Sequence, residues 1–469
     1  MVARIVVCAR VIVLMLVVDS LRADAPGFGG GEALTPGLDA LARGGTLYEE
    51  AICSAGWTVP SLTAIATGTF PHRVGVARWR HPFPARRPTL FTAFAAAGFE
   101  VHSFFHNPRW AFANTQARGT VGDSQDAEAV CAALRAPSGA DRLVFVHHWW
   151  THLPYRTEAI PRAPWRALCS EILGQLAQDP DSQRPRWRRA YLDTVEYLDS
   201  ELLPRYLDAA HSGGDDVLLC VTADHGENWG ESVPVGHEVG HIYDLHGRWL
   251  TDDTTRVPLV FAGGRRTDPV PAGHRLSGYA RGVDFAPTLC DLAGVPWPGP
   301  LSTAQGCTLI DRGVNEHTLR LDGESLAVGL RLGVGTDRDA AMTVTSNNAI
   351  VPAKYPRGAA RMWRRYSVRS RSGRYVWDGV DRTRHEQDGA GRLVSMGLGS
   401  RLRSALSPGR GAWTEMRAAR RQAVGPGAMV DKDQFPGLGD EDTGLDEAAA
   451  GLERDEDLEA SMRMLGYME

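Results

Sequence analysis

Short apolar runs alternate with amphipathic segments along the first two thirds of the chain. Four of the runs are nearly continuous, rich in β-branched residues and bounded by polar or turn residues, which predicts buried strands. They lie at 11–19, 142–150, 216–224 and 256–263. Four other segments space their apolar residues as helices do, at 35–45, 88–99, 185–210 and 280–295. Because strands alternating with helices form a mostly parallel sheet between helices, the predicted fold class is α/β.

The N-terminal segment resembles a signal peptide, because Arg4 precedes an apolar stretch that continues to Val18. Arg10 interrupts that stretch, no small-x-small cleavage site follows, and the stretch ends on the polar pair Asp19-Ser20. It is also too short and too broken to span a bilayer. We therefore predict that this segment is the first core strand and that the chain has no membrane span.

The pattern changes after about residue 310. The segments 323–333, 339–347 and 361–379 have the pattern of short antiparallel strands, the last containing a turn at Ser372-Gly373. The final stretch is rich in Gly, Arg and acidic residues. We predict a catalytic domain at 1–310, a small antiparallel-sheet α+β subdomain at 311–395, and a polar, partly disordered tail at 396–469 that ends in an amphipathic helix.

Composition excludes some classes of protein. The 469 residues are 43% hydrophobic and 23% charged with a formal net charge of -5, so the chain lacks the basic excess of a nucleic-acid binder. The seven cysteines are scattered and form no CxxC pair. That arrangement is typical of reduced thiols rather than a disulfide framework and predicts a cytoplasmic protein.

Polar residues capable of chemistry follow two of the predicted strands. Asp19 comes directly after the first, where a carboxylate can also be a simple helix cap, and Asp224 and His225 come after the third. The carboxyl ends of parallel strands are where ligands bind in such sheets. A carboxylate beside an imidazole suits Zn²⁺ or Mn²⁺ better than Ca²⁺, which prefers oxygen ligands alone.

Two further groups of residues have both a structural and a chemical interpretation. Thr58 opens the stretch TVPSLTAIATG, where Thr-x-Pro-Ser has the pattern of a helix start, so Thr58 or Ser61 either caps a helix or takes part in a reaction. Six histidines crowd two short segments, and we expect two of the six to be functional. They are His147, His148, His152, His237, His241 and His246.

The order of these segments resembles the sulfatase branch of the alkaline phosphatase superfamily. The similar segments are VVDSLRAD, TPGLDALARGGTLYEEAICSAGWTVPSLTAIATGTFPHRVGV, FVHHWWTHLPY, TADHGENWGE, LHGRWLTDDTTRVPLVFAGG and VDFAPTLCDLAGV, over roughly residues 11 to 300. The resemblance implies that Asp19, Asp224 and His225 bind a metal together with Thr58, which is the nucleophile. It also implies that His152 and His246 hold substrate oxygens, bind a second metal or protonate the leaving group.

The chain also departs from that family's pattern. Sulfatases carry Cys or Ser in a C/S-x-P-S-R motif and convert it to formylglycine, whereas Thr58 cannot become an aldehyde and Leu62 replaces the arginine. Ser20 stands where sulfatases have a second aspartate, and the only lysines, Lys354 and Lys432, lie beyond the core. A threonine nucleophile with Asp and His ligands resembles the phosphoryl-group enzymes of the superfamily.

We therefore predict a metal-dependent hydrolase, or a soluble transferase, of small anionic phosphate or phosphonate esters that forms a covalent intermediate on Thr58. The expected cofactor is Zn²⁺ or Mn²⁺ at one site, with room for a second. Two alternatives remain open: a sulfuric ester hydrolase that uses unmodified threonine, and a catalytically silent binding or scaffold homologue. Neither the substrate nor the oligomeric state follows from the sequence.

Overall fold

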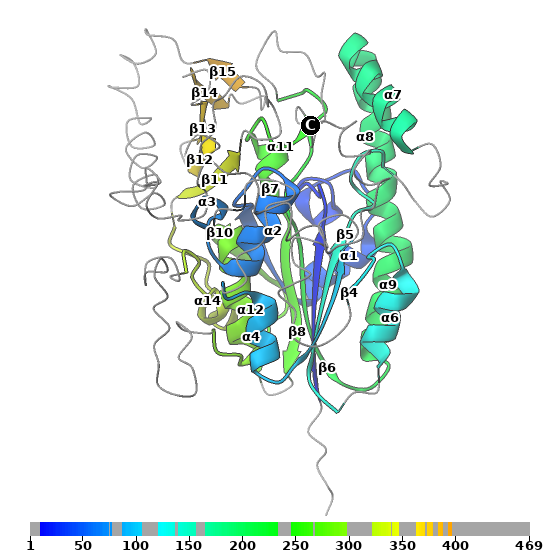
Figure 1. The fold of residues 1–469 in the computed structure, drawn as a ribbon, viewed down its shortest axis with the longest axis vertical. Helices are drawn as coiled ribbons and strands as arrows, with labels where there is room; N and C mark the ends of the chain where they lie inside the picture. The colour runs from blue at the N-terminus through cyan, green and yellow to red at the C-terminus, as the bar shows by residue number, and fades with distance from the viewer. Residues whose placement is uncertain are drawn as a thin grey trace, which may run out of the picture.

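The computed structural model places the strands of the chain in two sheets (Figure 1). It describes residues 10–74, 76, 87–105, 121–136, 139–155, 165–232, 245–265, 268–297, 321–338, 340–346, 363–370, 373–378, 383–387 and 393–395. The predicted tail at 396–469 and the predicted boundary near 310 lie outside these ranges, so the division into domains stays a prediction.

The larger sheet is mainly parallel and lies between two layers of helices, which confirms the predicted α/β class (Figure 1). Its strand order is β10-β2-β8-β6-β1-β5-β3-β4, with β7 pairing with β2 and β9 with β8. The strands are β1 (Val11–Val18), β2 (Thr46–Ile52), β3 (Glu100–Phe105), β4 (Val121–Gly122), β5 (Arg142–His148), β6 (Asp216–Ala223), β7 (Arg256–Val257), β8 (Leu259–Arg265), β9 (Asp268–Pro269) and β10 (His274–Arg281).

The centre of the sheet is strand β1, which pairs in parallel with β5 on one side and β6 on the other. All eight residues of β1 are buried, because helices cover both faces of a parallel sheet and its central strand therefore needs apolar side chains on both sides. The predicted first core strand is thus confirmed. In the described residues, no helix has the length and apolar character needed to cross a bilayer.

Strand β8 departs from the parallel order, since it runs antiparallel to both β6 and β2. The reason is topological: β7 and β8 start from the same end of the sheet as the one at which β6 finishes. The predicted strand at 256–263 is also broken in two, because Pro258 has no backbone N–H for the ladder.

Two groups of helices cover the sheet. One group contains α1 (Pro36–Gly44), α6 (Ala127–Arg135), α7 (Trp165–Gln178), α8 (Pro180–Tyr197), the π-helical turn η3 (Leu198–Leu202) and α9 (Leu203–His211). The other contains α2 (Thr58–Thr67), α3 (Pro71–Val74), α4 (Leu90–Ala96), the 3-10 turn η4 (Gly282–Asp284), α12 (Phe285–Ala293) and α14 (Ala327–Leu332). The short elements η1 (Gly27–Gly29) and α11 (Asp252–Thr255) lie in loops. The four predicted helices are therefore present, with shifted ends.

The smaller sheet has five antiparallel strands in the order β11-β12-β13-β14-β15. They are β11 (Ala340–Ser346), β12 (Trp363–Ser370), β13 (Gly373–Asp378), β14 (Thr383–Gln387) and β15 (Leu393–Ser395). The hairpin predicted in 361–379 is present, and it closes between Ser370 and Gly373.

The prediction of a strand at 323–333 is wrong, since this segment contains helix α14. Leu326, Ala327 and Leu330 are buried at helical spacing, and Gly333 ends the helix in the left-handed conformation at a φ of 64°. The sequence Ser-Leu-Ala-Val-Gly-Leu-Arg-Leu is short enough to match either period.

The smaller sheet is hydrogen-bonded to two loops of the larger one. Val344 of β11 exchanges backbone hydrogen bonds with Ser54 and Gly56, in the loop before α2. Arg374 of β13 is fully buried and makes an ion pair of 2.6 Å with Asp252 of α11. The sheet therefore supports the loops that lead to Thr58 and that contact Gly226.

Candidate active site

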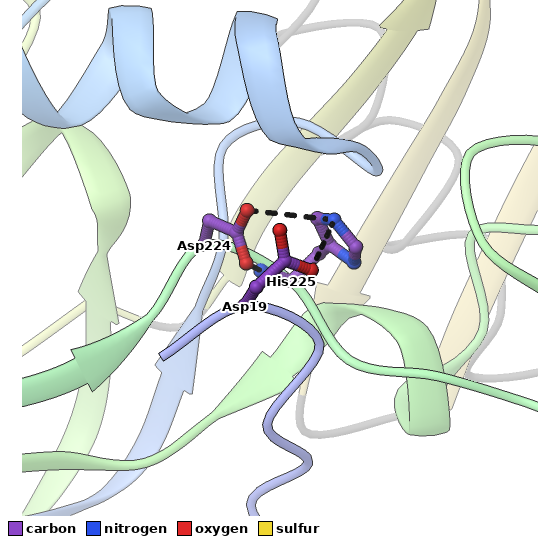
Figure 2. A group of neighbouring side chains, drawn as sticks. All are labelled: Asp19, Asp224 and His225. Carbon is purple, nitrogen blue, oxygen red and sulfur yellow. Dashed lines mark hydrogen bonds and ion pairs between the residues drawn. The ribbon is translucent and has the colours of Figure 1, made fainter. Parts of the chain in front are cut away.

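Three predicted metal-binding side chains meet where the central strands of the larger sheet end (Figure 2). Asp19 follows β1, and Asp224 and His225 follow β6; since Val18 pairs with Ala223, these residues leave neighbouring strands at the same level. All three are fully buried, and a carboxylate oxygen of each aspartate and a ring nitrogen of His225 lie within 4.8 Å of one another.

The tautomer of His225 follows from its hydrogen bond. Its Nδ1–H donates to the carbonyl oxygen of Gly226 at 2.8 Å, which leaves the lone pair on Nε2. That atom lies 3.5 Å from Asp224 Oδ2 and 3.8 Å from Asp19 Oδ1. Two buried carboxylates with a correctly oriented imidazole form a donor set that suits a divalent transition metal.

Thr58 completes this cluster from the start of α2, which belongs to the helix layer of α4 and α12. Its Oγ1 lies 3.2 Å from His225 Nε2 and 3.3 Å from Asp19 Oδ2. Trp57, not Thr58, occupies the N-cap position of α2, so the capping interpretation of Thr58 is wrong. Thr58 stands in the first helical turn, where free N–H groups and the helix dipole favour an anion.

Ser61 is not a cap either. Its hydroxyl donates to the backbone carbonyl of Asp224 at 2.6 Å, and both groups are buried. This bond joins the first turn of α2 to the loop that carries Asp224 and His225. The distance between Thr58 and that loop is therefore fixed by a direct hydrogen bond.

His147 also belongs to the cluster, although the sequence did not single it out from the other histidines. Its Nε2 lies 3.3 Å from Asp224 Oδ2 and 3.4 Å from Asp19 Oδ2. These distances exceed the about 2.7–2.9 Å of a charge-assisted hydrogen bond. They match the separation of about 3.3 Å between ligand atoms on a tetrahedral ion with bonds of about 2.0–2.1 Å. His147 is therefore a candidate fourth donor.

The charges of the cluster influence one another strongly. Burial alone would raise the pKa of Asp19, but the nearby imidazoles of His152, His147 and His225 hold that pKa well below its usual range. Burial opposes a charge on His147, yet the two carboxylates raise its pKa to about 9. The pKa of His225 is likewise raised, by Asp224 and Asp19 against the effect of burial.

The two predicted substrate histidines lie side by side next to this cluster. The ring centroid of His246 is 4.6 Å from that of His225 and 5.2 Å from that of His152. Trp149 stacks on the ring of His152, with the two ring centroids 4.7 Å apart. Burial lowers the pKa of His152, whose Nδ1–H donates to the carbonyl of Leu153 at 2.6 Å.

Glu227 lies behind His246, and the sequence prediction did not include it. It is fully buried, and its Oε1 forms a hydrogen bond of 2.8 Å with Nδ1 of His246. Burial raises the pKa of Glu227 to about 8, against the opposing effect of His152 and His225. Its position two residues after His225 in Asp-His-Gly-Glu was the only available signal.

The loop after β1 is held by a separate set of contacts. Ser20 adopts a left-handed conformation with a φ of 59°, and its hydroxyl donates to Asp19 Oδ1 at 2.8 Å. The hydroxyl of Tyr191 bridges the chain, accepting from Arg22 N at 2.9 Å and donating to Ser20 O at 3.0 Å. These bonds fix the loop and orient the carboxylate of Asp19. Ser20 supplies a hydroxyl at the position where a second aspartate would supply another carboxylate for the ion.

The remaining histidines of the two crowded segments are not part of this arrangement as described. His148 is adjacent to His147 on β5, so its side chain points to the opposite face of the sheet, where burial lowers its pKa to about 3. His237 and His241 lie outside the described residues.

Fold and site together define a class of protein. Solved structures of the alkaline phosphatase and sulfatase superfamily share this architecture. The phosphonate monoester hydrolase of Agrobacterium radiobacter superposes with a TM-score of 0.62 at 18% identity, covering 88% of this chain and 95% of that one. A 2-O glycosaminoglycan sulfatase, BT1596, gives a TM-score of 0.61 at 17% identity over 88% and 93%.

The family follows from the sequence match. The Sulfatase family model matches residues 12–132 and 134–295, so the chain belongs to the sulfatase family. Curated relatives include the low-salt glycan biosynthesis sulfotransferase Agl7 of Haloferax volcanii, 26% identical over 60% of each chain. Another is the Δ4,5-hexuronate-2-O-sulfatase of Bacteroides thetaiotaomicron, 22% identical over 58% of this chain and 65% of its own length. The chain thus spans about three fifths of the curated relatives that it matches.

Proposed function

We propose that this sulfatase-family protein is a metal-dependent hydrolase of phosphate or phosphonate esters that works through a covalent intermediate on Thr58. The observation that carries the proposal is the position of Thr58 Oγ1, within 3.3 Å of both Asp19 and His225 at the start of α2. Threonine cannot supply a formylglycine aldehyde, so an ester linkage to its own oxygen is the direct alternative.

Asp19, Asp224 and His225, with His147 as a further candidate, would hold a divalent ion, for which we favour Zn²⁺ or Mn²⁺. Such an ion would lower the pKa of the Thr58 hydroxyl and screen the negative charge of the ester. Ser20 provides a hydroxyl rather than a second carboxylate, which disfavours the oxygen-only site that Ca²⁺ prefers.

In the first half of the proposed reaction, Thr58 loses its hydroxyl proton to solvent, and its oxygen then forms a bond to phosphorus while the bond from phosphorus to the leaving oxygen breaks. His246 begins this half with both ring nitrogens protonated, and the leaving oxygen takes the proton of Nε2. In the second half, water forms a bond to phosphorus and gives a proton to the same nitrogen, while the bond from phosphorus to Thr58 breaks and releases the deprotonated oxygen. His246 is suited to both transfers because its Nδ1 is already bonded to Glu227.

His152 has a different proposed role. Its Nδ1–H is bonded to Leu153 O, and its lowered pKa favours the neutral ring, so Nε2 presents a lone pair. A lone pair repels a phosphoryl oxygen but accepts from a substrate hydroxyl or binds a second ion. Among the alternatives for His152, we therefore favour these two.

The proposed location is the cytoplasm, and the proposed partner is a small anionic ester. The cysteines that the structure describes, Cys53, Cys131, Cys169, Cys220 and Cys290, are all free and buried, which is compatible with a reducing compartment.

A sulfuryl-group enzyme is the second candidate, because the curated relatives include a sulfotransferase and a sulfatase. Turnover of 4-nitrophenyl sulfate, phosphate monoester, phosphate diester and phenylphosphonate by the Zn²⁺ or Mn²⁺ protein would separate the two. A dominant sulfate activity would overturn the phosphorus assignment. Protein that binds neither ion at stoichiometric level and turns over none of the four would be a silent homologue.

The nucleophile is tested by mass spectrometry after brief exposure to 4-nitrophenyl phenylphosphonate. Phosphate and sulfate adducts have nearly the same mass, whereas this substrate leaves a phenylphosphonyl group that is distinct from both. We expect the adduct on Thr58 of the wild type and on serine in Thr58→Ser, and none in Thr58→Val. An adduct on another residue would refute the role of Thr58.

A further inference from the structure

Glu227 is a buried carboxyl group beside the proposed metal-binding residues, and it enters the proposed reaction only through its bond to His246. Its side chain is turned toward this histidine instead of toward Asp19 and Asp224: Oε1 lies 2.8 Å from His246 Nδ1. The second oxygen, Oε2, is 3.5 Å from the hydroxyl of Tyr155, a weak contact. Among the residues that the structure describes, the hydrogen bond to His246 is therefore the main side-chain interaction of Glu227.

The backbone of Glu227 is fixed on both sides. Its N–H donates to the carbonyl of Asp253 at 3.0 Å, and its own carbonyl accepts from Arg22 Nη1 at 3.1 Å. With both backbone groups bonded to other loops, the carboxylate has little freedom to leave His246.

Aromatic residues lie on the other side of the Glu227 carboxyl group and are bonded to one another. Tyr155 has a φ of 58°, an unfavourable conformation for a bulky side chain, and its hydroxyl accepts from Trp229 Nε1 at 2.7 Å. Trp229 in turn lies under the guanidinium of Arg22, 5.2 Å from the ring centroid. The surroundings of Glu227 are thus tightly packed, and a shift of the carboxylate would disturb several contacts.

The two neighbouring histidines differ in what holds their Nδ1 atoms. His152 donates to a neutral carbonyl, that of Leu153, whereas His246 is hydrogen-bonded to a carboxyl group. In its ionised form a carboxylate accepts more strongly than a carbonyl and orients the ring in its plane, as the carboxylates bonded to catalytic and metal-binding histidines do.

We propose that Glu227 is a positioning residue that keeps the proton of His246 on Nδ1 and presents Nε2 to the leaving oxygen and to the attacking water. This inference rests on the proposed function, because it concerns the proton transfers assigned to His246. Glu227 itself touches neither substrate nor metal in this scheme.

The test compares Glu227→Gln with a matched control, Glu231→Gln. Glu231 lies in the same loop and bonds to Arg22 and to the backbone of Trp229, but it is not hydrogen-bonded to an imidazole of the described part of the chain. Nitrogen-15 NMR of the full-length, histidine-labelled protein reports the tautomer of His246 without any substrate. Kinetics with the best substrate of the ester panel report kcat and KM.

At a pH where the ring of His246 is neutral, we expect the wild type and Glu231→Gln to show the Nδ1–H tautomer. In Glu227→Gln the amide can donate to Nδ1 as well as accept from it, so the Nε2–H tautomer should become populated, with kcat lower by a factor on the order of 10² to 10³ and KM nearly unchanged. In a His246→Gln background, adding Glu227→Gln should cause little further loss, since both changes remove the same function.

An unchanged tautomer in Glu227→Gln, or a loss of kcat that adds fully to that of His246→Gln, would overturn the inference and leave Glu227 a structural residue. Absence of ester turnover by the wild type would instead count against the proposed function. In that event the tautomer measurement still decides whether Glu227 controls His246.

Discussion

Replacing Gly226 with alanine should displace the loop that carries Asp224 and His225 without changing any proposed metal donor. A Cβ at this position would lie 2.0 Å from the carbonyl oxygen of Asp253 and 3.0 Å from its carbon. That carbonyl belongs to α11. The same helix accepts a hydrogen bond from Gly226 N at the carbonyl of Thr254 and one from Glu227 N at the carbonyl of Asp253. Because both partners are backbone, no side-chain rotation can relieve the overlap.

The size of the effect follows from this overlap. One of the two backbones must move by about 1 Å, and a displacement of that size near a reacting group costs about 10²-fold in rate. His225 precedes the substituted residue, so we expect Gly226→Ala to lower kcat/KM by about 10²-fold. Overpacking should also destabilise the fold by about 1–3 kcal/mol. Metal affinity should fall in parallel, because His225 is one of the proposed donors.

The assay combines metal titration by calorimetry, steady-state kinetics and thermal unfolding, with Gly44→Ala as the control. A Cβ at Gly44, in the last turn of α1, meets no heavy atom within 4 Å. That change should stabilise the protein by about 0.4–1 kcal/mol and leave metal binding unchanged. If Gly226→Ala kept the metal affinity and the kcat/KM of the wild type, the contact with α11 would not be what positions His225.

Three further predictions concern the supports of the site. His147→Ala should weaken the affinity for Zn²⁺ at least about 10-fold and change the visible spectrum of the Co²⁺ form, whereas His148→Gln should change neither; equal affinities would exclude His147 as a donor. Ser61→Ala removes the bond to Asp224 O, which should cost about 1–3 kcal/mol and lower kcat, whereas Thr63→Ala, which removes only a bond within α2, should lower stability alone. Equal kcat in the two variants would contradict the positioning role of Ser61. Arg374→Met should destabilise the fold by about 2–3 kcal/mol, less than for a fully buried pair because Asp252 keeps 26% of its surface exposed. Burial opposes the charge on Asp252, but Arg374 and Arg369 lower its pKa in the folded protein. The pair therefore adds stability at a pH above the pKa that Asp252 has in the unfolded chain, and this stability is lost as the pH falls through its pKa in the folded protein. Chemical denaturation of Arg374→Met between about pH 5 and pH 3 should therefore show a shallower loss of stability than the wild type, and an unchanged slope would exclude this pair as its source.

The central strands could be predicted because their environment determines their composition. Strands β1, β5 and β6 are buried on both faces, so their sequences are continuous apolar runs. Strands β2 and β10 lie toward an edge of the sheet and mix charged with apolar residues, so the pattern did not identify them. Segment 323–333 was mistaken for a strand because six helical residues are too few to distinguish the two periods.

The candidate site was predictable only in part for a similar reason. Asp19 and Asp224 stand at the ends of recognisable strands, so their proximity follows from parallel pairing. The sequence Val-His-His shows two equivalent histidines, and only the register of β5 against β1 decides that His147 faces Asp19. The role of Glu227 could not be predicted, because it depends on the position of His246 in another loop. A local sequence pattern does not show which residues of two loops come into contact.

The hydrogen bonds from the smaller sheet to the larger one also affect the order in which the protein is completed during synthesis. Every proposed metal-binding and catalytic residue has left the ribosome before β11 and β13 are made. Yet Val344 holds the loop that leads to Thr58, and Arg374 holds the loop of α11 that contacts Gly226. A nascent chain that ends before β11 therefore contains the whole reactive set without its support. We expect such a truncated chain to bind metal poorly, so that full metal loading follows the emergence of the C-terminal strands.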